Sequence, residues 1–310
     1  MTKRAMGNLV NRYRSVLKKC HLINTFGSLA VAAILVMGVT DGEAFSNAVG
    51  YNVTSTSTPG TTVSVTDTSE NAVASGIKAE TSATYSVPST ITRAEATAIG
   101  KQSALSLGVF AQSSSGNRLT VNLAPLDISS TAVTENGSSR SVGIYSDVNS
   151  SVSVHGGTIV SSAHSKNGIA EAFGAMSQNN SSVTLGADSI VLSAESSKKL
   201  SDPRTVGIYF SDNSTFNVTS NRIRVDVSAT HNGDVFSRKV NGIYGDKNST
   251  LTMNDADISV REINSTPDKS GAAGIHLFTA STLAMKDASI RVAAIDHEGT
   301  FAGSAIGIVT

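Results

Sequence analysis

The stretch that decides the fold is Asn241-Gly242-Ile243-Tyr244-Gly245-Asp246-Lys247-Asn248-Ser249-Thr250-Leu251-Thr252-Met253, followed after Asn254 by Asp255-Ala256-Asp257-Ile258-Ser259-Val260. Near copies of it recur along the chain, and their anchor glycines are Gly76, Gly108, Gly143, Gly174, Gly207, Gly242, Gly274 and Gly307. Successive anchors are 32, 35, 31, 33, 35, 32 and 33 residues apart. Self-similarity at such a period is typical of solenoid proteins, in which each repeat buries its apolar face against its neighbours.

The spacing inside the repeat indicates which kind of solenoid this is. In the five clearest copies the second apolar run begins 9 residues after the glycine, and the third has an isoleucine 16 residues after it. Polar and apolar residues alternate within these runs, as in Thr250-Leu251-Thr252-Met253. A period of two indicates strands with one buried face. Three short strands and three corners in each repeat predict an all-β parallel β-helix of the pectin-lyase type, with coils of about 33 residues.

The predicted core consists of three stacks of inward side chains. The first stack is Ile144, Ala175, Ile208, Ile243 and Ile275; the second is Val152, Val183, Phe216, Leu251 and Leu283; the third is Ile159, Ile190, Ile223, Ile258 and Ile290. Because the offsets from glycine to isoleucine are constant, we expect all length variation to fall between that isoleucine and the next glycine.

Residues 1–44 are predicted to be a signal peptide with a long basic start. An uncharged run of 14 residues, 26–39, is about the size of a signal-peptide apolar region, and the small residues Gly42 and Ala44 predict cleavage after Ala44. The only cysteine, Cys20, lies within this leader, so the mature chain has no disulfide and no thiolate metal site. The leader holds six of the 24 bases and two of the 24 acids, which leaves 18 bases against 22 acids, a net charge of −4.

The rest of the chain divides into two segments. Residues 45–107 are rich in Ser and Thr and are expected to form a lead-in and irregular first coils. Within them, the capping-box spacing of Thr92-Arg93-Ala94-Glu95 predicts a short helix near 92–105. Residues 108–310 hold the β-helix repeats, which stop part-way through a further coil, so we expect this chain to be the front part of a longer protein.

Candidate binding residues recur at fixed places in the repeat. Tyr145, Tyr209, Tyr244 and His276 each follow an inward position, so we expect them to point outward in one row that could contact sugar rings or an extended partner. The alternative is a surface ladder whose members only support one another. The corner asparagines, Asn149, Asn180, Asn213 and Asn248, are predicted to be turn residues with left-handed backbone; they would be glycosylation acceptors only in a eukaryotic secreted chain.

The sequence predicts no catalytic residue, metal site or cofactor. The histidines fall at different places of the repeat and the carboxylates are scattered over its corners, so neither forms a recognisable catalytic or metal-binding set. No basic stripe is interleaved with aromatic residues, which argues against a nucleic-acid partner.

A long basic leader followed by cysteine-free, Ser/Thr/Asn-rich coils of the form Gly-Ile-Tyr-x-x-x-Asn-Ser-Thr resembles the passenger domain of bacterial autotransporters, especially adhesin-like members. The resemblance implies export by type V secretion in a Gram-negative bacterium and display at the outer membrane or release outside the cell. It also implies membrane association only through a C-terminal barrel beyond these residues. The partners would be proteins or glycans of host-cell or bacterial surfaces. The alternative is a secreted carbohydrate-active β-helix enzyme, a polysaccharide lyase or hydrolase.

Overall fold

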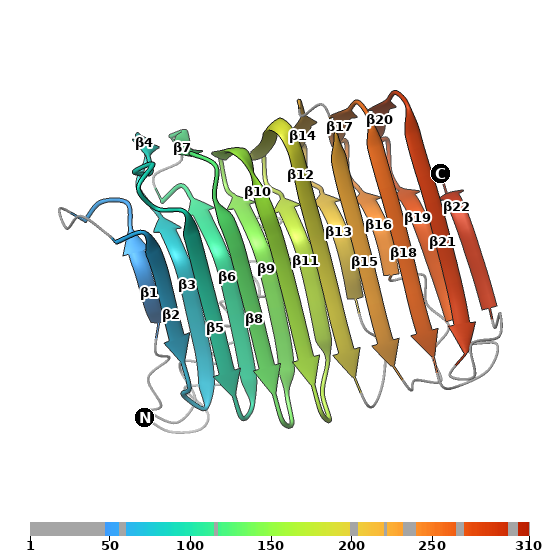
Figure 1. Cartoon of the computed structure of the whole chain (residues 1–310), viewed down its shortest axis with the longest axis horizontal. Coiled ribbons are helices and arrows are strands. Elements are labelled where there is room, and N and C mark those ends of the chain that lie inside the picture. Colours follow the sequence, from blue (N-terminus) through green and yellow to red (C-terminus); the bar gives the residue numbers. More distant parts are fainter. Residues whose placement is uncertain are drawn as a thin grey trace, which may run out of the picture. The chain divides into compact units, whose positions relative to one another are not determined.

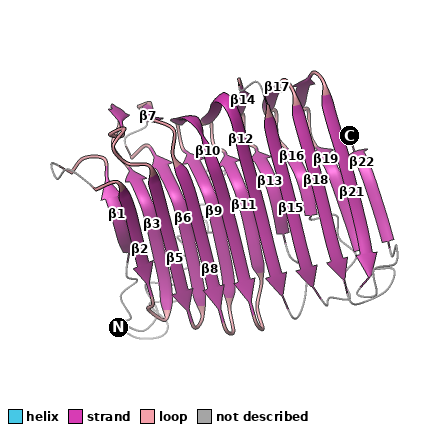
Figure 2. Ribbon diagram, in the orientation of Figure 1, coloured by secondary structure: helices cyan, strands magenta, loops and turns pink. Residues whose placement is uncertain are grey.

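The structure is a computed structural model of the 310-residue chain. It describes residues 47–309, except 56–59, 115–116, 199–203, 220–221, 232–239, 265–269 and 297–302. The predicted signal peptide and its cleavage after Ala44 lie outside the described residues. Within the described part every regular element is a β-strand, as Figure 2 shows.

The first strand of each coil belongs to a nine-stranded parallel sheet. Its strands, in spatial order, are β1 (Asn47–Asn52), β3 (Asn71–Ala79), β6 (Ser103–Gln112), β9 (Ser138–Asp147), β11 (Ala170–Ser177), β13 (Arg204–Phe210), β16 (Val240–Gly245), β19 (Ser270–Leu277) and β22 (Gly303–Val309).

The second and third strands of each coil belong to a thirteen-stranded parallel sheet. The second strands are β4 (Thr84–Ser86), β7 (Leu119–Leu123), β14 (Thr215–Val218), β17 (Thr250–Met253) and β20 (Thr282–Met285); the third strands are β2 (Thr62–Asp67), β5 (Arg93–Gly100), β8 (Asp127–Thr134), β15 (Ile223–His231), β18 (Ala256–Asn264) and β21 (Ala288–Asp296). In two coils the second and third strands run together as β10 (Ser150–Ser165) and β12 (Ser182–Lys198).

Each strand pairs in parallel with the same strand of the next coil, so the strands follow one another in chain order in Figure 1. For example, β13 pairs with β16 and sets Ile208 opposite Ile243, while β16 pairs with β19 and sets Ile243 opposite Ile275. The predicted parallel β-helix with three strands in each coil is therefore confirmed.

Two of the three predicted stacks are confirmed residue by residue. The stack of Ile144 and the stack of Val152 both continue through their five coils without a shift. The third is wrong at two places, because Ile159 pairs with Leu192 and Val225 pairs with Ile258. The coils that start at Gly174 and Gly207 carry two extra residues at the second corner. Length therefore varies there too, contrary to the prediction.

The predicted helix near 92–105 is also wrong, since β5 and β6 occupy these residues. In β5 the alternate residues Ala94, Ala96 and Ala98 are buried and the residues between them are more exposed. Here alanine serves as a small inward side chain of a strand, and packing overrides its helix propensity.

In the coils up to residue 194, the composition of the core differs between the first corner and the end of the third strand. Near the first corner the core is built of large aliphatic and aromatic residues, as it is in the later coils, where they include Phe210 and Phe216. Where the third strand returns to the first strand it is built of alanine and serine: Ala72, Ala74, Ala96, Ala98, Ala104, Ala132, Ala163, Ala170, Ala172 and Ala194, with Ser106, Ser130, Ser141 and Ser161. The serine hydroxyls bond to one another at 2.9–3.0 Å, both between the first and third strands of one coil and from one coil to the next, which satisfies these buried polar groups.

The anchor glycines allow the two sheets to approach each other closely along the row of positions that these glycines occupy. A Cβ on Gly242 would lie 2.6 Å from the carbonyl oxygen of Gly274 in the next coil and would also collide with Cγ2 of Ile258 across the core. The same pair of neighbours recurs at Gly274, where the atoms belong to Gly307 and Ile290. The period first seen in the sequence is thus a steric requirement of the stacked coils.

Candidate functional site

The structure brings the four predicted binding residues into one row on the outer side of the nine-stranded sheet. The row follows the strand register through Phe110, Tyr145, Met176, Tyr209, Tyr244 and His276. The rings of Tyr209 and Tyr244 are stacked with centroids 5.3 Å apart and planes 3° apart, and His276 meets Tyr244 edge-on at 5.5 Å. The expected alignment is therefore present.

The expected solvent exposure of this row is largely absent. Tyr145, Tyr209 and His276 are only 6%, 4% and 7% exposed, and the row packs with neighbours such as Phe173 into a second apolar cluster, separate from the core. Tyr244 is half-buried. Mutual packing of this kind favours the ladder that supports itself. The accessible part of the row is its C-terminal end, where Phe278 is 46% exposed and lies 4.2 Å from His276 between ring centroids.

Two arginines and a glutamate flank the aromatic row. The guanidinium carbon of Arg204 lies 5.0 Å and 5.2 Å from the ring centroids of Tyr209 and Tyr244, which is cation–π distance. Arg140 donates to Glu171 at 2.7 Å through Nε, and Glu171 is paired in register with both arginines. The pair is mostly buried, so the charges are held in place by their neighbours.

A buried polar network lies between Tyr145 of the aromatic row and the first corner of the coil. The Tyr145 hydroxyl donates to Asp147 Oδ2 at 3.0 Å, Asn179 donates to Asp147 Oδ1 at 2.6 Å, and Gln178 donates to the Tyr145 oxygen at 2.5 Å. Burial raises the pKa of Asp147 above its usual value, although the hydrogen bonds that the carboxylate accepts act in the opposite direction. Burial and the neighbouring Asp147 raise the pKa of Tyr145.

The asparagine corner has the predicted backbone. Asn149, Asn180, Asn213 and Asn248 have φ of 53°, 60°, 60° and 58°, which confirms the left-handed turn. The residue before each of them is left-handed as well, which the sequence did not predict. Backbone hydrogen bonds link the corners of neighbouring coils, as from Asn213 N to Lys247 O at 3.0 Å.

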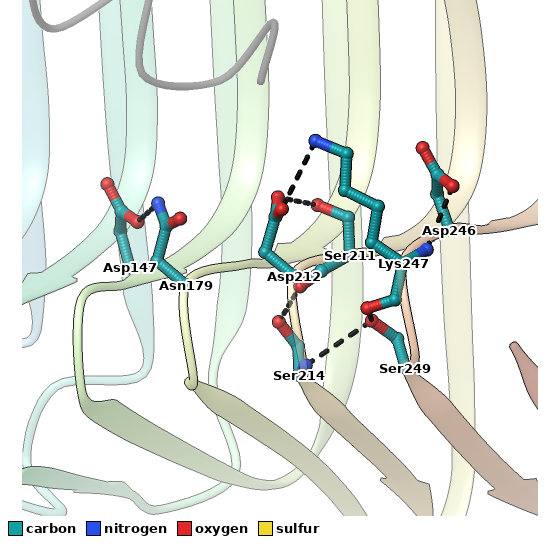
Figure 3. A network of polar contacts seen from close by, with 8 residues as sticks. All are labelled: Asp147, Asn179, Ser211, Asp212, Ser214, Asp246, Lys247 and Ser249. Carbon is teal, nitrogen blue, oxygen red and sulfur yellow. Dashed lines mark hydrogen bonds and ion pairs between the residues drawn. The ribbon is translucent and has the colours of Figure 1, made fainter. Parts of the chain in front are cut away.

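Polar side chains reinforce these corners, as Figure 3 shows. Lys247 Nζ lies 3.2 Å from Asp212 Oδ1 in the preceding coil, and Ser211 donates to the other oxygen of the same carboxylate at 2.9 Å. Beneath them, Ser214 N donates to Ser249 Oγ at 3.3 Å. The charges at this corner are therefore paired with each other.

A depression of about 310 Å³ lies beside the asparagines. Its lining consists of Arg118, Asn149, Asn180, Ser181, Ser182, Asn213 and Thr215. The sequence indicated the asparagines but not Arg118, which stands outside the regular repeat. Its only signal was its place one residue before the strand residue Leu119, where later coils have the corner asparagine.

One histidine has serine partners that the sequence did not reveal. The two ring nitrogens of His164 lie 2.8 Å from Ser162 Oγ and 2.6 Å from Ser197 Oγ. In a hydrolase triad a carboxylate occupies the third place and stabilises the imidazolium, and a hydroxyl group does not supply that charge. Within the described residues, no three His, Cys, Asp or Glu side chains are placed to hold a metal ion.

No protein-family model, curated protein or solved structure matches this chain. Among the described residues, there is also no helix long and apolar enough to cross a membrane. The functional proposal therefore rests on the sequence and on the geometry of the coils.

Proposed function

We propose that this protein is an exported, surface-displayed β-solenoid of the autotransporter-passenger type, acting as an adhesive scaffold that contacts proteins or glycans of host or bacterial surfaces. The observation that carries the proposal is the repetition of polar groups in register along the outside of the coils, from the exposed corner asparagines to the outward threonines of the second strands. Equivalent groups recur from coil to coil at about 4.8 Å, the spacing of neighbouring strands.

Such a surface suits an extended partner better than a small substrate. Each coil offers a weak contact of the same kind, and a partner that engages several coils at once gains affinity through effective concentration. The proposal that the chain is exported rests on the basic start, the short apolar run and the small residues before Phe45.

Export is tested by expressing the chain with its own leader in a Gram-negative host. Mass spectrometry of the periplasmic fraction should find a protein that begins at Phe45, and Leu35→Arg in the apolar run should keep the leader attached and the protein in the cytoplasm. An intact leader on periplasmic protein, or export that survives Leu35→Arg, would contradict the predicted signal peptide.

Adhesion is tested with beads coated with the purified protein and applied to cultured epithelial cells and to Gram-negative bacteria. Binding should fall gradually as outer residues of several coils are replaced together, because no single coil supplies most of the affinity. Turnover of a polyuronate by the purified protein, abolished by one substitution, would instead establish the carbohydrate-active enzyme.

A further inference from the structure

The outer side of the second strands carries two rows of small, uncharged side chains, which are polar except at Ala284. The row nearer the corner is Thr120, Ser151, Ser182, Thr215, Thr250 and Thr282, and the row two residues further on is Asn122, Ser153, Thr184, Asn217, Thr252 and Ala284. Their inward neighbours, such as Val183 and Leu251, are fully buried, so the backbone that carries the two rows is held in place by the core.

A third row runs beside these at the corner itself. It consists of Asn149, Asn180, Asn213 and Asn248, and Arg118 occupies the equivalent place in the coil before Asn149, since Leu119 N donates to Asn149 O at 3.2 Å. The last three of these asparagines are exposed. An amide carries both donors and an acceptor, and a hydroxyl can act as either. The three rows together can therefore donate hydrogen bonds to the hydroxyl groups of a ligand and accept hydrogen bonds from them.

Arg118 adds the one cation that lines the depression. It is exposed, and its Nη2 lies 3.5 Å from Ser182 Oγ, so the side chain extends along the rows rather than away from them. The nearest lysine along the corner, Lys247, is paired with Asp212. A guanidinium presents a planar set of donors that matches a carboxylate.

We propose that this strip binds a linear glycan that carries an isolated carboxylate, with the acidic sugar at Arg118 and neutral sugars along the amide and hydroxyl rows. A chain of sugars presents hydroxyl groups at a repeat close to the spacing of the coils, so successive sugars meet successive coils. A polyanion with a charge on every sugar fits poorly, because the depression has a single cation among six uncharged lining residues. The glycan site would be part of the proposed adhesive surface, and its biological role rests on that proposed function.

The experiment measures binding of the purified full chain by calorimetry at low salt. The probes are pairs of xylan-, glucan- and galactan-derived oligosaccharides of equal length, one neutral and one carrying a single uronic acid. At least one acidic member should bind about tenfold more tightly than its neutral partner, as expected for one hydrogen-bonded charge pair. If no pair binds, or if the neutral members bind as well as the acidic ones, the proposal is wrong.

Variants assign the binding to the strip. Arg118→Gln should remove the preference for the acidic oligosaccharide and leave the affinity for the neutral one unchanged. The double variant Asn180→Gly, Asn213→Gly should weaken both about tenfold, because glycine keeps the left-handed backbone while removing the amides. The matched control is Arg224→Gln, which removes an exposed arginine from a third strand and should change neither affinity. Unchanged binding in the first two variants would overturn the assignment.

Export and adhesion have separate readouts. A chain that binds the acidic oligosaccharide in vitro but is not exported would contradict the proposed function and leave the glycan site standing. An exported, adhesive chain that binds none of the oligosaccharides would contradict the glycan site, leave the proposed function standing and point to a protein partner.

Discussion

The corners of the coils depend on pairs of residues with left-handed backbone, and two of these pairs begin with a β-branched residue, Val148 and Thr279. Val148 has φ of 43°, whereas the equivalent residue of the next coil is Asn179 with φ of 56°. A β-branched residue in this region is strained, whereas asparagine tolerates it because it is unbranched at Cβ and its short polar side chain can hydrogen-bond to the nearby backbone.

We therefore expect Val148→Asn to stabilise the protein by about 1 kcal/mol, measured as a higher midpoint of thermal unfolding. The control is Val160→Asn, which places the same change on an exposed strand residue outside the left-handed corners and should give no gain. Equal effects of the two substitutions would show that the corner strain is not relieved.

Asp147 gives a pH signature at the same corner. Its folded pKa is raised by burial, so the folded carboxyl holds its proton to a higher pH than the unfolded one. Its contribution to stability is therefore complete below the ordinary value of 3.8 and is lost as pH rises through the folded pKa. Denaturant unfolding should show the wild type losing stability relative to Asp147→Asn as pH rises above 3.8. A difference that stays constant from acid to neutral pH would contradict the raised pKa.

At the scale of the element, the anchor glycine lets the first strand of each coil pack closely against its neighbours. We expect Gly242→Ala to destabilise the protein by about 2 kcal/mol, because the added methyl group meets both the Gly274 carbonyl and the Ile258 side chain. Gly60→Ala is the control, since a Cβ there has no atom within 4 Å, and its thermal midpoint should barely change. Similar losses in both variants would show that the close approach at Gly242 is not a constraint.

At this scale the sequence predicts the strands that recur in every coil, but it does not predict the local shifts in register or the packing of small side chains. The glycine spacing and the alternation in strands such as Thr250–Met253 predict the coil, because each is imposed by the frame. The slip that pairs Ile258 with Val225 leaves no trace in the pattern, since a shift of two residues keeps every side chain on its face. The helix predicted near 92–105 from its capping-box spacing is absent, because Ala94, Ala96 and Ala98 fill a narrow space between the sheets, which local spacing does not encode.

The candidate site was predictable to a similar degree. The alignment of Tyr145, Tyr209 and Tyr244 follows from the repeat, but their burial depends on packing between side chains of several coils, which the spacing does not encode. Arg118 was missed because its coil departs from the repeat, and only the register through Leu119 places it beside the corner asparagines.

At the scale of the whole molecule, equivalent positions of the repeat line up across the described coils and form rows of side chains. A row is useful for weak, repeated contact with an extended partner, and its geometry holds only while neighbouring coils stay in register. Both the proposed adhesive surface and the glycan strip therefore depend on the register of the parallel strands.

That register is tested most directly by engineered disulfides in a Cys20→Ser background. Thr215 and Thr250 are opposite each other on neighbouring strands, about 4.8 Å apart, so the pair Thr215→Cys, Thr250→Cys should oxidise readily and raise the thermal midpoint. Moving the second cysteine two residues along, to Thr252→Cys, increases the Cα separation to about 8 Å and should prevent the bond. Cross-linking of the shifted pair and failure of the in-register pair would contradict the stacked β-solenoid.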